Sequence, residues 1–179
     1  MRISILIIAL ISSFSVTAQS VSGKLTLNEK SKTELKLETN SAVQLFKEFK
    51  TGKYQLKFSF DGKELPNNIY KEKIIFFEFI TSIKKDGKLV KNVIRKQPIP
   101  YFPGEMFLPA EAFDFIGVLA GADEEASATV VPALNELLGT MPKGNYTVEL
   151  SVKPLGVKGE IKPVEFSFLL RKRPGRTKL

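Results

Sequence analysis

The chain has 179 residues, of which 27 are lysine or arginine and 19 are aspartate or glutamate, giving a net charge of +8. It contains no histidine and no cysteine, which excludes Ser-His and Cys-His nucleophilic sites and nearly all zinc, copper and haem sites. No glycine-rich phosphate loop of the G-x-x-x-x-G-K type is present either. We therefore expect a protein that is not an enzyme and that has no cofactor or metal.

Residues 1–18 have the pattern of a secretory signal peptide. Arg2 is followed by the apolar run ISILIIALI and by the small-residue end Val16-Thr17-Ala18. The apolar run is shorter than the roughly 20 residues that a membrane span needs, which makes a short membrane anchor the weaker alternative. We expect cleavage before Gln19 and a periplasmic or secreted protein, with one domain over residues 19–170 and a basic tail over 171–179.

Alternating apolar and polar residues predict that the domain is mainly β. The pattern is clearest in GKYQLKFSF (residues 52–60) and in GNYTVELSV (residues 144–152), and EFSFLL (residues 165–170) is similar. Two weaker segments lie near the start of the domain, at residues 23–27 and 33–39. A period of two with one apolar face is typical of half-buried antiparallel strands.

A β-hairpin is predicted around Asp86-Gly87, which lies between two apolar-rich runs. This dipeptide favours a two-residue type I′ turn, because glycine adopts a positive φ without strain. Such a turn places Lys85 opposite Lys88. The same register, continued along both strands, brings Glu78 opposite Arg95, and we expect these two side chains to form a structural ion pair.

The first strand of this hairpin is apolar on both faces. One face carries Ile75, Phe77, Phe79 and Ile83, and the other carries Ile74, Phe76 and Ile80. A strand of this kind has to be covered on both sides. One cover is the rest of the β structure, and the second comes from elsewhere in the chain or from a partner.

An acidic block lies between Lys96 and Lys143. It contains no lysine or arginine, and it holds seven acidic residues: Glu105, Glu111, Asp114, Asp123, Glu124, Glu125 and Glu136. Helical spacing of Phe113, Ile116 and Ala120 predicts a helical insertion at about residues 104–140, because this length exceeds that of an ordinary loop. We expect the block to cover the second apolar face of the hairpin, or to present an apolar contact surface to a partner: Phe102, Met106, Phe107 and Phe113.

Two short segments share the pattern G-x-Y-x-apolar, at Gly52–Leu56 and Gly144–Val148. The pattern resembles the tyrosine-bearing strand of immunoglobulin-like sandwiches, in which a tyrosine near the strand start anchors a corner. The resemblance implies an antiparallel, immunoglobulin-like β-sandwich that carries the helical insertion.

The carboxylates of the acidic block are the remaining candidates for chemistry. A glycan hydrolase needs two of them at roughly 5–10 Å, and Glu105, Glu111 and Asp114 are close in sequence. The alternative is a solvated helix face. Asp123-Glu124-Glu125 is more typical of a helix start than of a calcium loop, because calcium loops alternate their acids with other residues.

The C-terminal segment RKRPGRTKL is strongly basic. It allows electrostatic contact with anionic surfaces through five side chains: Arg171, Lys172, Arg173, Arg176 and Lys178. No aromatic residue lies between these charges, so we expect no nucleic-acid partner. The leading hypothesis is a non-catalytic exported binding or structural module of the bacterial cell envelope, contacting a protein or polymer. A carboxylate-based glycan hydrolase and a basic protein that binds anionic lipid or polysaccharide are the alternatives.

Overall fold

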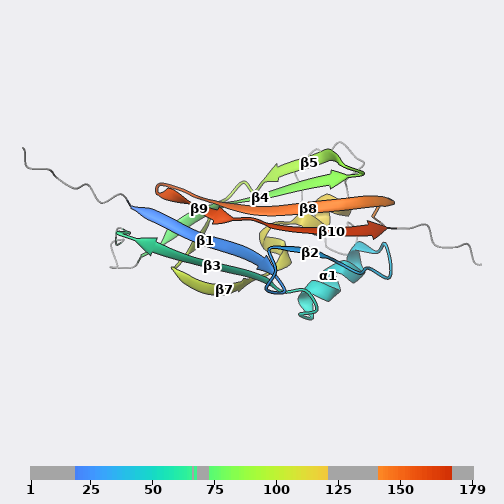
Figure 1. The fold of residues 1–179 in the computed structure, drawn as a ribbon, viewed down its shortest axis with the longest axis horizontal. Coiled ribbons are helices and arrows are strands. Elements are labelled where there is room, and N and C mark those ends of the chain that lie inside the picture. Colours follow the sequence, from blue (N-terminus) through green and yellow to red (C-terminus); the bar gives the residue numbers. More distant parts are fainter. Residues whose placement is uncertain (1–18, 66, 68–72, 121–140, 171–179) are drawn as a thin grey trace, which may run out of the picture.

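The computed structural model of the chain describes residues 19–65, 67, 73–120 and 141–170. The predicted signal peptide, the Asp123–Glu125 cluster and the basic tail lie outside the described residues. The described part of the chain is mainly β, which confirms the predicted class (Figure 1). None of its helices combines the length and the apolarity that crossing a membrane would require.

The strands form two mixed sheets. The four-stranded sheet has the order β7-β3-β1-β9, with β1 (Ser20–Leu27), β3 (Leu56–Lys63), β7 (Gly104–Leu108) and β9 (Lys158–Lys162). The six-stranded sheet has the order β2-β10-β8-β4-β5, with β2 (Lys32–Glu34), β10 (Val164–Leu170), β8 (Gly144–Pro154), β4 (Ile75–Lys85) and β5 (Lys88–Ile94), while β6 (Ile99–Tyr101) also pairs with β4. Each sheet contains one parallel pair, β1 with β9 and β2 with β10.

The apolar faces of the two sheets meet in one core. The fully buried ring of Phe77 on β4 packs edge-on against Phe58 of β3, with 5.1 Å between the ring centroids, and against Phe60 at 4.9 Å. The alternation predicted for residues 54–60 and 144–152 is what places these inner side chains on one face of each strand. Packing of this kind stabilises both sheets through the removal of apolar surface from water.

Helices complete the core. Helix α1 (Ala42–Lys50) is capped by Ser41, whose hydroxyl group accepts a hydrogen bond from the Gln44 amide at 3.3 Å. The helix buries Leu45. A 3-10 turn η1 (Ala110–Ala112) leads into α2 (Phe115–Ala120). The Phe115 ring of α2 then lies 5.0 Å from Phe49 of α1.

The predicted start of the helical insertion is wrong. Residues 104–108 form strand β7 and not a helix, because Met106 and Leu108 alternate with polar or exposed positions and pair with β3. Helical structure within residues 104–120 is limited to η1 and α2, and residues 121–140 lie outside the described part of the chain.

The predicted hairpin is present, but its register shifts after two pairs. Asp86 and Gly87 have φ values of 51° and 79°, as a type I′ turn requires, and Lys85 pairs with Lys88 as expected. A β-bulge at Ile83/Lys84 then moves the pairing along by one residue.

The described residues leave the outer face of β4 partly exposed, and residues 121–140 of the acidic block, which were predicted to help cover it, lie outside them. Phe76 remains 51% exposed, and Ile74 and Ile80 are half-buried. The described end of the acidic block packs instead on the inner face, where the buried Thr81 hydroxyl group donates to the Phe113 carbonyl oxygen at 2.9 Å. The segment packs on the inner face because the apolar row of that face is already part of the core between the sheets.

We expect Thr81→Val to lower the free energy of unfolding by about 1–3 kcal/mol, because the Phe113 carbonyl group would lose its buried donor. Ser82→Ala is the matched control on the opposite face of β4, where the hydroxyl group contacts Asn92 at an exposed position, and it should cost less than about 0.5 kcal/mol. Urea denaturation measures both, and equal losses would contradict this position of the segment.

Candidate contact surface

The four residues predicted to form a contact surface do not lie together. Phe102 and Phe107 are 54% and 64% exposed, so both are available to a partner. Met106 is half-buried and points toward the core. Phe113 is only 4% exposed, because its ring packs on Phe79 at 4.9 Å, and it therefore does not belong to the surface.

Strand β7 presents Phe107 at the edge of the four-stranded sheet. One side of β7 pairs with β3, and no described strand pairs with its other side. Pro103 and Pro109 flank the strand, and neither has an amide hydrogen, so the pairing edge is limited to Gly104–Leu108. Glu105 and Phe107 alternate with the inward-facing Met106 and Leu108 and therefore lie on the outer face.

A small acidic cluster accompanies this edge. The Lys57 ammonium group lies 2.7 Å from a Glu105 carboxylate oxygen and 3.1 Å from one of Glu29. The hydrogen bonds that the Lys57 ammonium group donates to Glu105, and then to Glu29, raise the pKa of Lys57 above its ordinary value. Because two carboxylates share one ammonium group, one excess negative charge remains beside β7.

An apolar groove of about 430 Å³ adjoins the same edge. Its walls come from α1 and its C-terminal turn, from the start of β3 and from the segment that follows β7. Half-buried Phe46 and Phe49 contribute aromatic surface, and exposed Glu111 lies on the opposite wall. The groove is large enough for one or two apolar side chains of a partner and offers them aromatic contacts.

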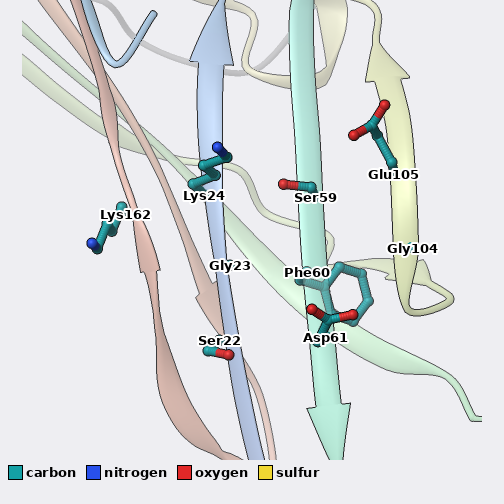
Figure 2. A pocket seen from close by; sticks show the side chains of 9 residues that line it. All are labelled: Ser22, Gly23, Lys24, Ser59, Phe60, Asp61, Gly104, Glu105 and Lys162. Carbon is teal, nitrogen blue, oxygen red and sulfur yellow. The ribbon is translucent and has the colours of Figure 1, made fainter. Parts of the chain in front are cut away.

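A second, polar groove of about 580 Å³ lies on the outer face of the four-stranded sheet. Figure 2 shows Ser22 and Lys24 of β1 beside Ser59 of β3, with Lys162 on β9. Lys24 and Lys162 occupy paired positions on neighbouring strands, and no ion pair within the described residues involves either of them. Lys24 and Lys162, beside hydroxyl groups, suit the binding of an anionic group, whereas the carboxylates of Asp61 and Glu105, which line the same groove, oppose it.

The predicted ion pair between Glu78 and Arg95 is not formed. The bulge places Arg95 opposite Phe79, whose carbonyl oxygen accepts a hydrogen bond from the Arg95 amide at 2.9 Å. The Arg95 guanidinium group instead donates to the carbonyl oxygens of Glu111 and Ala112, at 2.9 and 3.1 Å. Arg95 therefore positions the turn η1.

The three carboxylates considered for hydrolysis have different surroundings. Glu105 is bound by Lys57, and Glu111 is exposed. Asp114 is also an exposed residue, but nearby protein atoms displace part of the water around its carboxyl group, and this desolvation raises its pKa, while the charge of Arg95 lowers it in part. Within the described ranges, no three acidic side chains gather in a way that could hold a metal ion.

No protein-family model matches the chain, and no curated protein matches it.

Helix α1 and the Lys57 cluster were not predicted from the sequence. Helix α1 has a recognisable signal, since Ser41 precedes apolar residues at helical spacing, namely Ala42, Leu45, Phe46 and Phe49. The Lys57 cluster has no such signal, because Glu29, Lys57 and Glu105 are far apart in the sequence and only strand pairing brings them together.

The pKa shift of Asp114 predicts a pH dependence of stability. Because the folded chain binds this proton more tightly than the unfolded chain, the free energy of unfolding falls as the pH rises from about 3.8 through the folded-state pKa. Asp114→Asn removes this loss, and asparagine tolerates the positive φ of 52° at this position. Relative to the parent, the variant should gain stability between about pH 3 and about pH 7 in urea denaturation. A pH-independent difference would contradict the proposed desolvation.

Proposed function

We propose that the chain is a non-catalytic, exported binding module of the bacterial cell envelope that contacts a protein partner through the β7 edge. The observation that carries the proposal is the exposed Phe107 on an open strand edge, beside an aromatic-lined groove. Interfaces are enriched in aromatic residues and depleted of lysine at their centres. The edge lies in the one long part of the sequence that has no lysine or arginine.

We infer that the fold is an immunoglobulin-like sandwich over residues 19–170, with an insertion between β7 and β8. In such domains, strands A, B and E share one sheet, and strands C, F and G share the other. Two sets of adjacent strands support this assignment. Strands A, B and E correspond to β1, β3 and β7, and strands C, F and G correspond to β4, β8 and β10.

A tyrosine near the start of strand F supports the same inference. The buried Tyr146 ring lies near the start of β8, and its hydroxyl group donates to the Pro142 carbonyl oxygen, four residues upstream, at 2.9 Å. A bond of this kind is typical of the tyrosine corner of these domains. The other G-x-Y segment differs, because the Tyr54 hydroxyl group donates to the carbonyl oxygen of Lys36, 18 residues upstream, at 3.3 Å.

The proposed location and the absence of catalysis rest on the sequence. The charged start, apolar run and small-residue end of residues 1–18 support export. The lack of histidine and cysteine leaves carboxylates as the main catalytic candidates, and the ion pair of Glu105 with Lys57 favours a structural role for that residue. A hydrolase is therefore the weaker hypothesis.

Photo-crosslinking in the native envelope tests the proposed surface. A benzoylphenylalanine in place of Phe107 should give a discrete protein adduct, and the same residue in place of Phe76 should not. The two positions are matched, since both are phenylalanines with about half or more of their surface exposed, and they lie on different sheets. Adducts at position 76 alone would move the contact to the outer face of the six-stranded sheet and overturn the proposal.

The polar groove favours a second candidate function, the binding of an anionic polysaccharide or lipid. Its support is the unpaired, adjacent Lys24 and Lys162. Ionic attraction of this kind weakens with salt.

We expect Lys24→Glu/Lys162→Glu to lower affinity for a polyuronate or for anionic phospholipid vesicles by at least about tenfold at low salt. The charge-matched control, Lys88→Glu/Lys153→Glu, changes two exposed lysines of the other sheet and should have a smaller effect. Titration against each ligand distinguishes the two sources of negative charge. An affinity that does not change with ionic strength would exclude this function.

A further inference from the structure

We propose that the partner binds by adding an extended, basic strand to the edge of β7. This inference rests on the proposed function, and it specifies how the β7 surface recognises its partner. An extended segment that joins an open sheet edge gains backbone hydrogen bonds, and its alternate side chains give specificity.

The β7 edge carries no lysine and no proline between its ends, unlike the other edges. Natural proteins keep exposed strand edges from pairing by placing lysine or proline on them, or by shortening the strand. Among the described edge strands, β5 carries Lys88 and Lys91, β9 carries Lys158 and Lys162, β2 has only three residues including Lys32, and β6 contains Pro100. Strand β7 is limited to five residues by Pro103 and Pro109, but it carries neither lysine nor proline itself.

The side chains of β7 predict which residue types should alternate along the added strand. On the inner side, Met106 borders the core and Leu108 also lines the apolar groove, so the inward-facing residues of an added strand should be apolar. On the outer side, Glu105 and Phe107 would contact the alternate residues of that strand. A lysine or arginine suits both positions, since it pairs with a carboxylate and also packs over an aromatic ring.

The local charge favours the same partner. The cluster of Lys57, Glu29 and Glu105 keeps one excess negative charge, while the exposed Glu111 and Lys50 balance each other on the groove walls. From Gln97 to Ala120 the chain contains no cation. A basic strand is attracted to this edge, whereas an acidic one is repelled.

The test uses two peptides, (Lys-Val)5 and (Glu-Val)5, which share their apolar residues and differ in charge. The lysine peptide should bind the full chain and should slow the amide hydrogen exchange of residues 104–108, whereas the glutamate peptide should do neither. Phe107→Lys should lower the affinity for the lysine peptide by roughly tenfold or more, because it adds a repelling charge and removes the aromatic contact. The matched control Phe76→Lys, an exposed phenylalanine of the other sheet, should stay within about twofold of the parent.

Several outcomes would overturn the inference. These are no binding of the lysine peptide, equal binding of both peptides, unchanged affinity in Phe107→Lys, or protection on β5, β9 or β2 instead of β7. A concentration-dependent, Phe107-dependent dimer in sedimentation would identify a second copy of the chain as the occupant instead. Crosslinking at position 107 without any of the peptide effects would leave the proposed function in place and would remove only strand addition.

Discussion

The contact of Phe77 with Phe58 and Phe60 joins the two sheets, and the rest of the structure depends on it. The three rings are almost completely buried, and Phe77 meets each of the other two edge-on, in a geometry that aromatic quadrupoles favour. Because Phe77 alternates with Phe76 along β4, burying one ring in the core directs the other to the outer surface. The half-exposed outer row of β4 therefore follows from the packing of its inner row.

The same core determines which residues of the acidic block are buried and which remain exposed. Thr81 and Phe79 hold Phe113 on the inner face, and Arg95 binds the carbonyl groups of the preceding turn. This arrangement anchors the chain directly after β7, which pairs with β3 on one side and with no described strand on the other. Of the block's aromatic residues, Phe107 lies exposed on this edge, whereas Phe113 is buried in the packing.

The distribution of lysine connects the fold with the proposed function. Lysines on the other sheet edges keep them from pairing, and β7 itself carries no lysine or arginine, which leaves one short edge available. The groove beside that edge is lined by α1, whose phenylalanines also pack on α2. Core packing and the contact surface thus share residues, which gives the edge a rigid support.

The sequence by itself determined the mainly β class, the strands around Phe58 and Val148, and the turn at Asp86-Gly87. These features depend on local alternation and on the φ preferences of single residues. Only the tertiary structure decided the bulge in the hairpin, and with it the separation of Arg95 from Glu78, because an inserted residue changes every later pair without a signal in composition. It also decided which side of β4 receives the acidic block and which strand edge stays open, since both depend on contacts between residues far apart in the chain.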